Sequence, residues 1–231
     1  MSFFSKFALK FIHNLSALDL SIAHQLRAKS TKEAVEFYYK HMMGSQIFGT
    51  KQSMLDYELS KCSCEGLYLE FGVALAFFTN YMAKKIKPKV IHGFDSFKGF
   101  PEYFNGTSTE EHNYHGKLPT VNDNVKLHPG WFESSIPEFI KNNDEQIAYL
   151  NIDCDLYSST STVFNYLGNR IQKGTIIHFD EFLNFPDWRN HEFKAWNEFV
   201  EENKILFDYI AIGNRGEVSV KITGFQKKKN N

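Results

Sequence analysis

Two of the β-like apolar runs in this chain are each followed by a pair of carboxylates. Asp153 and Asp155 follow one run, and Asp180 and Glu181 follow the next. In an open α/β sheet, ligands bind beyond the carboxyl ends of the strands, so these side chains are expected at one shared edge. Carboxylates buried side by side repel one another and lose hydration, which disfavours their ionised form. A divalent cation such as Mg²⁺ prefers hard oxygen ligands, and the pattern therefore indicates a cation site.

For some polar residues of this region, a structural role is the alternative to a role in a cation site. Asp155 is also placed to cap a helix that begins three or four residues later, whereas Asp153 and Asp180 have no comparable explanation. His178 precedes Asp180 by two residues in an alternating run, so we expect its ring in the packed core. Three further histidines are expected at the surface, with a role as bases as the lesser alternative: His112, His115 and His128.

A second group of residues suggests nucleotide binding. Gly72 ends the first apolar run, and Asp95 ends the second, 23 positions later. A glycine at such a turn lets the backbone approach a nucleotide, and an acidic residue about 20 positions on can accept hydrogen bonds from a ribose. The other glycines of that motif are missing. Ala74 and Ala76 occupy the positions at which the motif needs small residues. Taken alone, the two residues are better explained as turn formers.

Short β-like runs alternate with helical segments from residue 67 onward, which is typical of parallel βαβ units. The expected strands are residues 66–71, 90–94, 124–127, 147–152, 175–179, 208–212 and 218–225. The expected helices are residues 76–85, 136–142, 159–171 and 192–203, with Gly174 as the stop signal of the third. Residues 214–217 have hairpin-turn chemistry, which predicts an antiparallel last strand. The predicted fold class is α/β, with a Rossmann-like, doubly wound, mostly parallel seven-stranded sheet and a helical N-terminal extension.

The chain divides into two parts. Residues 1–60 are interpreted as the helical extension, acting as a lid or in oligomerisation, and residues 61–231 as one α/β domain. Eight apolar residues recur near helical spacing between Phe3 and Leu18, which indicates an amphipathic helix. We expect this helix to pack on its own domain or on a second subunit of a homo-oligomer, with membrane-surface contact as the lesser alternative. Residues 104–122 are long for a connection and are expected to be a substrate loop or lid, or else a surface loop.

Composition excludes several classes of protein. The 231 residues include 26 basic and 27 acidic side chains, and 42% of the residues are hydrophobic, which excludes a disordered chain, a collagen and a coiled coil. The balanced charge gives no field for nucleic acid, so no nucleic-acid partner is expected. The longest apolar runs are far below the ~20 residues that span a bilayer. We therefore expect a soluble, cytoplasmic protein without a transmembrane segment, with peripheral membrane contact as the lesser alternative.

With these residues assembled, the chain resembles the metal-dependent, S-adenosylmethionine-using O-methyltransferases of the macrocin O-methyltransferase type. The most specific blocks are DSFKGFPE at 95–102 and NIDCDLYSST at 151–160. Further matching blocks are GLYLEFGVALA at 66–76, PGWFESSIPEF at 129–139 and GTIIHFDEFLNFPDW at 174–188, continued by HEFKAWNEF. The resemblance implies a class I methyltransferase domain at residues 61–231.

The resemblance also implies roles for particular residues. Glu70 and Gly72 would border the methionine and ribose of S-adenosylmethionine, and Asp95 with Ser96 the ribose and adenine side. The family usually has a glycine where Ala76 stands, so this position is a departure. The acceptor would be a hydroxyl group of a sugar, a glycan precursor or a glycosylated natural product, recognised by the loop 104–122.

The carboxylates take the remaining roles. The three metal ligands of the family match Asp153, Asp180 and Glu181, which would hold Mg²⁺ or a similar cation against the acceptor hydroxyl. Asp153 or Asp155 would accept the hydroxyl proton, because both lie beside the metal. Two alternatives stay open: a nucleotide-sugar glycosyltransferase, since Asp153 and Asp155 form a D-x-D pair, and a catalytically silent relative that keeps the fold as a binding protein.

Overall fold

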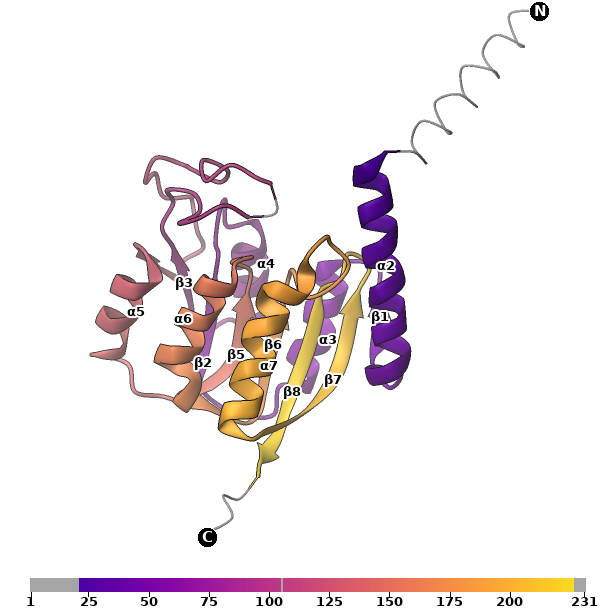
Figure 1. Cartoon of the computed structure of the whole chain (residues 1–231). Helices are drawn as coiled ribbons and strands as arrows, with labels where there is room; N and C mark the ends of the chain where they lie inside the picture. Colours follow the sequence, from indigo (N-terminus) through magenta and orange to yellow (C-terminus); the bar gives the residue numbers. More distant parts are fainter. Residues whose placement is uncertain (1–20, 105, 227–231) are drawn as a thin grey trace, which may run out of the picture.

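The computed structural model describes residues 21–104 and 106–226, and its centre is one eight-stranded sheet (Figure 1). The strands are β1 Gln46–Phe48, β2 Leu67–Phe71, β3 Ile91–Asp95, β4 Val125–Pro129, β5 Ile147–Ile152, β6 Ile171–Phe179, β7 Ile205–Gly213 and β8 Val218–Phe225. Their order is β1-β7-β8-β6-β5-β2-β3-β4, and all neighbours pair in parallel except β8, which is antiparallel to β6 and β7. The predicted Rossmann-like, mostly parallel sheet with an antiparallel last strand is confirmed. It has one strand more than the seven expected, because β1 adds an edge beside β7.

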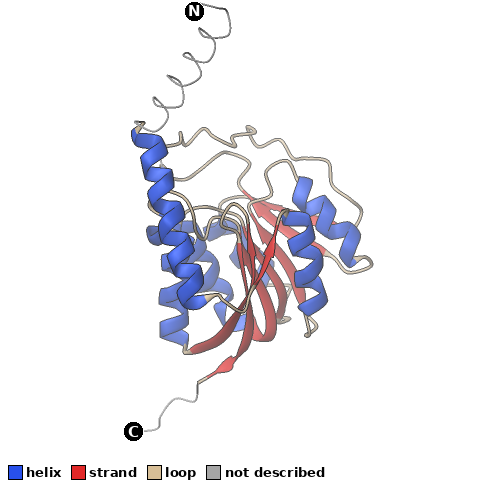
Figure 2. Ribbon diagram, turned by 90° about the vertical axis from the view of Figure 1, so that its right-hand side faces the viewer, coloured by secondary structure: helices blue, strands red, loops and turns tan. Residues whose placement is uncertain are grey.

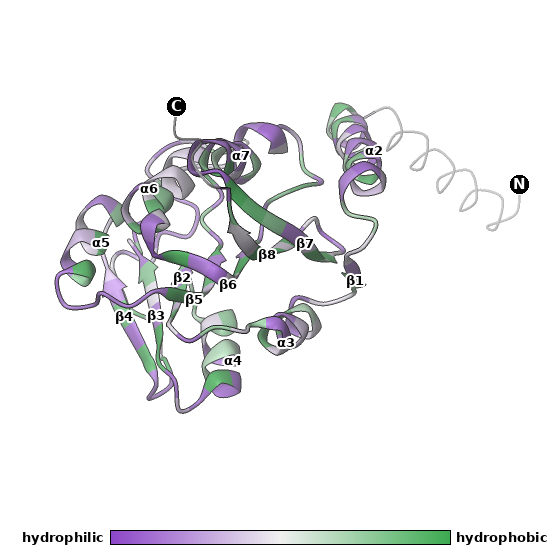
Figure 3. Ribbon diagram, turned by 90° about the horizontal axis from the view of Figure 1, so that it is seen from below, coloured by the Kyte–Doolittle hydropathy of each residue, from purple (hydrophilic) through white to green (hydrophobic). Residues whose placement is uncertain are grey.

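Helices cover both faces of the sheet (Figure 2). They are α2 Ile22–His41, α3 Lys51–Lys61, α4 Phe77–Ile86, α5 Phe132–Ile140, α6 Tyr157–Leu167 and α7 Glu192–Asn203, with short 3₁₀ turns at Gly168–Arg170 and Trp188–Asn190. Seen from below, α5, α6 and α7 lie on one side of the strands, and α3 and α4 lie on the other (Figure 3). This is the three-layer arrangement that a doubly wound sheet requires.

The central strands are buried on both faces, which explains their continuous apolar runs. All residues of β2 and β5 are buried. On one face, Leu69 and Leu150 pack beneath α5, α6 and α7, in a cluster that includes Trp196. On the other face, Tyr149 packs with Met82 of α4. The two cores fix the sheet between its helices and thereby fix the strand ends that carry the site.

Residues 159–174 differ from the expected helix and stop. The helix ends at Leu167, and Ile171 already begins β6. Gly174 lies inside that strand with φ +99°, at a register irregularity against β5. A Cβ there would lie 3.0 Å from the Ser63 hydroxyl oxygen, and glycine inside a strand commonly marks such a bulge. Gly174 therefore marks a bulge in a strand and not the end of a helix.

Two expectations concern the N-terminal part and membranes. The amphipathic segment between Phe3 and Leu18 lies outside the described residues. Within residues 21–104 and 106–226, no helix combines the length and the hydropathy needed to cross a membrane.

Candidate active site

The site lies where the strand order changes direction. β2 has β3 on one side and β5 on the other, and β6 follows β5. The carboxyl ends of these four strands carry Gly72, Asp95, Asp153 and Asp180, so the sheet brings all four to one edge. Ligands of open α/β sheets bind at such a switch in strand order.

Gly72 is required by a close approach of two backbones. It has φ +95°, and a Cβ at this position would lie 1.6 Å from the carbonyl oxygen of Asp153. The Asp153 N–H donates to the Phe71 carbonyl at 2.8 Å, which continues the β2–β5 pairing up to the turn. No larger residue fits without separating these two strand ends, so the glycine belongs to the geometry of the site.

Asp95 holds the turn after β2. Its Oδ2 accepts hydrogen bonds from the Val73 and Ala74 N–H groups at 2.9 and 2.8 Å, and its Oδ1 accepts one from Phe97 N–H at 2.7 Å. One carboxylate therefore joins the turns that follow β2 and β3. These are the two loops expected to enclose a nucleotide.

A cavity of about 380 Å³ opens beside these turns. The predicted cofactor residues and the candidate catalytic carboxylates line it together: Glu70, Gly72, Asp95, Ser96, Asp153 and Asp155. Aromatic side chains that sequence reasoning missed complete the wall, among them Phe100, Tyr114 and Trp131. The loop 104–122 contributes to the same cavity through Tyr114 and His112, so His112 is exposed, as expected, and also lines the cavity.

Ala76 occupies the position of the family's glycine without losing the backbone conformation. It has φ +60° in the left-handed region and is fully buried at the start of α4. A non-glycine residue costs roughly 1–2 kcal/mol in that conformation. The chain therefore keeps the turn that glycine would favour and adds one methyl group beside it.

Glu70 is a buried carboxyl group at the base of the cavity. It is 1% exposed, and its Oε1 accepts a hydrogen bond from the Asn151 amide at 3.1 Å. Its Oε2 is buried and has no hydrogen-bond partner among the described residues. Burial raises the pKa of Glu70 to about 8, so the group is mainly protonated at neutral pH.

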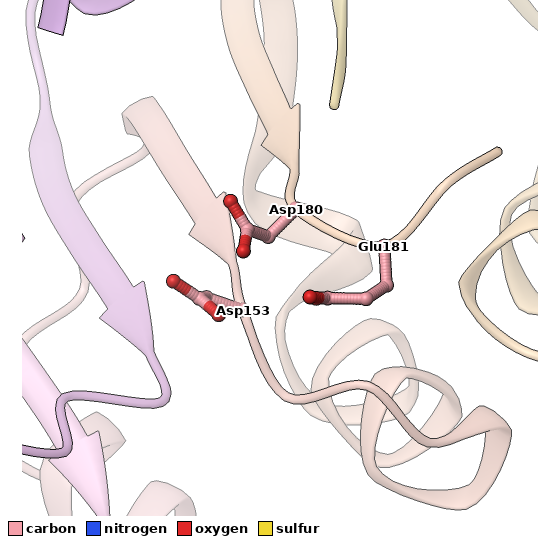
Figure 4. A group of neighbouring side chains, drawn as sticks. All are labelled: Asp153, Asp180 and Glu181. Carbon is pink, nitrogen blue, oxygen red and sulfur yellow. The ribbon is translucent and has the colours of Figure 1, made fainter. Parts of the chain in front are cut away.

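Asp153, Asp180 and Glu181 form the predicted acidic cluster (Figure 4). Each offers a carboxylate oxygen, and these three atoms lie within 4.8 Å of one another. The Oε2 of Glu181 is buried without a hydrogen-bond partner in the described part of the chain. Three hard oxygen donors with an unsatisfied buried atom fit a divalent cation.

Asp155 does not cap the following helix. The N-cap of α6 is Leu156, and no side-chain cap hydrogen bond is found at this helix start within the described residues. The alternative of a structural cap is therefore wrong. Burial and the neighbouring Asp153 raise the pKa of Asp155 to about 7, and its side chain lines the cavity. A carboxylate with such a pKa can accept a proton near neutral pH.

Lys51 is a charged residue of the site that was not predicted from the sequence. Its Nζ lies 2.6 Å from Asp153 Oδ2 and 2.6 Å from Asp180 Oδ1, and 4.3 Å from the centre of the Phe78 ring. Burial alone would lower the pKa of Lys51, but the two carboxylates outweigh that effect and raise it. The ammonium group is therefore charged and neutralises part of the acidic cluster.

His178 is buried as predicted, but its ring also contacts charged groups. It is 0% exposed, and its Nδ1 lies 2.8 Å from Glu58 Oε1. Tyr149 donates its hydroxyl to Glu58 Oε2 at 2.6 Å, and Ser219 donates to Oε1. Burial lowers the pKa of His178, yet the Glu58 charge prevails and raises it to about 10. The imidazolium Nε2 lies 3.7 Å from Asp180 Oδ1 and supports the ionised state of that carboxylate.

Glu192 brings a further acid to the cluster from α7. It is 0% exposed, and its Oε2 accepts a hydrogen bond from the Glu181 N–H at 3.2 Å. Burial, followed by the neighbouring Asp155, raises the pKa of Glu192 well above its usual value. The backbone hydrogen bond fixes the loop that carries Glu181.

Known structures share this fold. CalS11, a calicheamicin methyltransferase, has a TM-score of 0.57 and 19% sequence identity, with 87% of this chain and 93% of CalS11 covered. The O-methyltransferase NovP has a TM-score of 0.56 and 18% identity, with 74% and 77% covered. An O-methyltransferase from Bacillus cereus, solved in complex with SAH, has a TM-score of 0.50 and 13% identity, with 89% and 94% covered. The fold is therefore that of the Rossmann-like methyltransferases.

A family model matches part of the sequence. The macrocin-O-methyltransferase (TylF) family model matches residues 107–218, which include the carboxylates after β5 and β6. Over this stretch the chain is similar to the macrocin O-methyltransferases, and it is an S-adenosylmethionine-dependent O-methyltransferase. The glycosyltransferase alternative is wrong. No curated protein matches the chain in sequence.

Proposed function

We propose that this enzyme methylates a hydroxyl group of a sugar, a glycan precursor or a glycosylated natural product, with a divalent cation at the acidic cluster. One observation carries the proposal: Asp153 belongs both to the acidic cluster and to the wall of the 380 Å³ cavity. A cofactor in that cavity and a hydroxyl at the cluster would be neighbours. Proximity of this kind is what group transfer requires.

The cavity residues take the cofactor roles in this proposal. Glu70 and Gly72 border the methionine and ribose, and Asp95 and Ser96 border the ribose and adenine. The Asp95 carboxylate keeps both cofactor loops in place through its backbone hydrogen bonds. Trp131 and other rings of the wall exclude water and offer apolar surface to the base.

The acidic residues take the catalytic roles. Asp153, Asp180 and Glu181 would hold the cation, which supplies positive charge that lowers the pKa of the acceptor hydroxyl. Asp155 is the better proton acceptor of the two candidates, because Asp153 would hold the cation whereas Asp155 lines the cavity outside the cluster of three ligands. S-adenosylmethionine, when bound, would supply the methyl group, and Asp155 would take the proton that the acceptor hydroxyl loses.

The sugar acceptor is supported by analogy with structural neighbours. CalS11 is described as a TDP-rhamnose 3′-O-methyltransferase, and the family model is named for a macrocin O-methyltransferase. The residues that would select the acceptor lie on the loop 104–122 and around Phe185 and Arg215, which border the small pocket next to Asp180 and Glu181.

Calorimetric titration with S-adenosylmethionine and with S-adenosylhomocysteine, with and without Mg²⁺, tests the cofactor part without knowledge of the acceptor. We expect saturable binding of both compounds, weakened at least tenfold in Asp95→Ala. Asp123→Ala, which removes an exposed carboxylate paired with Lys87, is the control and should bind as the wild type does. Binding of neither compound would contradict the proposal.

An acceptor screen over sugars and glycosides then tests the cation part. With a methylated acceptor in hand, Asp153→Asn and Asp180→Asn are each expected to reduce methyl transfer and its dependence on Mg²⁺. Unchanged transfer and unchanged metal dependence in both variants would refute the cation site.

A further inference from the structure

Lys51 occupies the place that a cation would take in the acidic cluster. It lies at equal distances of 2.6 Å from one oxygen of Asp153 and one oxygen of Asp180. A Mg²⁺–oxygen bond is about 2.0–2.1 Å long, so a cation bonded to the same two oxygens would lie within about 4 Å of the ammonium nitrogen. Two positive charges at this distance repel each other strongly. Each would also occupy the carboxylate oxygens that the other needs as hydrogen-bond acceptors or ligands.

The location of Lys51 in the chain gives no local reason for a lysine. It is the first residue of α3, directly after the N-cap Thr50, whose side chain accepts a hydrogen bond from the Ser53 N–H. A positive charge at a helix N-terminus is disfavoured by the helix dipole. The lysine is therefore explained by its tertiary partners, Asp153 and Asp180, which lie more than 100 positions later in the sequence.

Lys51 neutralises the cluster only in part. Asp155, Glu181 and Glu192 surround the same pair of aspartates, and Glu181 Oε2 and Glu192 Oε1 are buried without hydrogen-bond partners among the described residues. One ammonium group cannot satisfy all of these acids. The remaining acceptors still favour a cation of higher charge.

Lys51 can leave the cluster without a change in the fold. Its side chain is 19% exposed, and a lysine ammonium sits on a flexible four-carbon stem. The α3 helix is held independently by Glu58, which is bonded to Tyr149 and His178 in the core. Rotation of the lysine side chain would free both aspartates while the helix stays in place.

We propose that Lys51 is an exchangeable counter-ion: its ammonium group and the divalent cation compete for Asp153 and Asp180. This inference rests on the proposed function, because it concerns the same cation site. Lys51 holds the two aspartates together before the cation arrives, and the cation binds by displacing it. The lysine thereby lowers the affinity of the site for the cation.

Titration of the full chain with Mn²⁺, followed by the electron paramagnetic resonance signal of the free ion, tests the exchange. Lys51→Met keeps the length of the side chain and removes its charge, so Mn²⁺ should bind at least ten times more tightly than to the wild type. Lys61→Met, at the other end of α3 and over the Tyr57 ring, is the matched control and should bind as the wild type does. Equal or weaker binding in Lys51→Met would overturn the exchange alone.

A second measurement uses only the wild-type chain, in case Lys51→Met does not fold. Reductive methylation of lysines is read by mass spectrometry on the peptide that contains Lys51, with and without Mn²⁺. We expect Mn²⁺ to raise the modification of Lys51 at least threefold, because displacement exposes its amine. Unchanged or reduced modification, with Mn²⁺ bound, would overturn the exchange. If Mn²⁺ binds to neither protein while S-adenosylhomocysteine binds to both, the cation part of the proposed function fails together with the exchange.

Discussion

At the scale of single residues, the site depends on acids whose protonation differs from that in water. Glu70 is the clearest case, because its carboxyl group is 1% exposed and accepts a hydrogen bond from the neutral Asn151 amide. Burial raises its pKa to about 8. A cationic group brought next to it favours the ionised form and lowers that pKa. In the proposed role, the amino group of S-adenosylmethionine is such a cation.

Cofactor binding is therefore expected to release close to one proton per site at pH 7. Calorimetry in buffers of different ionisation enthalpy measures this number, because the released proton is taken up by the buffer. At pH 9 the release should be much smaller, since Glu70 is then already ionised. Glu70→Gln removes the titrating group and should bind without this proton release. The same proton count in Glu70→Gln and in the wild type would show that another group titrates.

Asp155 gives a prediction for the chemical step. If it accepts the acceptor proton, Asp155→Asn should reduce kcat by about 10²–10⁴-fold, the usual contribution of a general base. The affinity for S-adenosylhomocysteine should change little, because the amide has nearly the same shape as the carboxylate. Steady-state kinetics with an acceptor from the screen measures the first quantity, and calorimetry measures the second. A wild-type kcat in the variant would assign the proton to another group.

At the scale of secondary-structure elements, the junction between β2 and β5 decides whether the site can form. Gly72→Ala places a methyl group at the position that is 1.6 Å from the Asp153 carbonyl oxygen and forces a left-handed conformation on alanine. The conformation alone costs roughly 1–2 kcal/mol, and the collision adds to it. We expect Gly72→Ala to lower the free energy of unfolding by at least about 2 kcal/mol and to abolish cofactor binding. Gly44→Ala is the control, because no atom lies within 4 Å of its new Cβ; equal stability of the two variants would contradict the junction model.

The pairing of β3 with β4 predicts a loss of stability in acid. His92 and His128 face each other with their ring nitrogens 3.0 Å apart, and His92 packs against Phe139. Burial, together with His128 and Lys126, lowers the pKa of His92 to about 4. Between pH 6.5 and pH 4, the unfolded chain therefore binds a proton that the folded chain does not, and the free energy of unfolding falls by about 3 kcal/mol as the pH falls.

Urea unfolding from pH 7 to pH 4 measures this loss. His92→Gln removes the titrating group, so its unfolding free energy should decrease less steeply in this range than that of the wild type. His115→Gln replaces an exposed histidine and serves as the control. Parallel curves for the wild type and His92→Gln would assign the acid sensitivity to other groups.

At the scale of the whole molecule, sequence periodicity predicts the strands and the residues at their ends. It does not predict contacts between residues that are far apart in the sequence. The acids after β5 and β6 could be predicted because a strand end is a local feature and parallel strands share one edge. Lys51 and Glu58 could not, since their partners Asp153 and His178 follow 102 and 120 positions later. Strand β1 was missed because three residues are too few to show an alternation. The lysine at a helix start was the one available signal for Lys51.

The N-terminal part of the molecule also has a face that residues 21–104 and 106–226 leave uncovered. The inner side of α2 packs through Phe37 against Trp188 and Phe193 near α7. In the same turns of α2, Val35 and Tyr39 are 49% and 66% exposed, and Met43 after the helix and Ile47 in the edge strand β1 are 64% and 65% exposed. Exposed apolar stripes of this kind commonly mark contacts between subunits, and an edge strand offers unpaired backbone groups.

This face predicts where the homo-oligomer expected from the sequence would form. The double substitution Val35→Lys and Tyr39→Lys places two charges four residues apart on the exposed side of α2, where burial against a second subunit would be costly. We expect sedimentation velocity to show an oligomer for the wild type and a monomer for this variant, with the urea midpoint of the monomer little changed. Tyr166→Lys, on the exposed side of α6, adds a charge elsewhere and should leave the oligomer intact. A monomeric wild type would reject the oligomer. An oligomeric double variant would place the interface on another surface, because an interface at α2 would not tolerate two buried lysines.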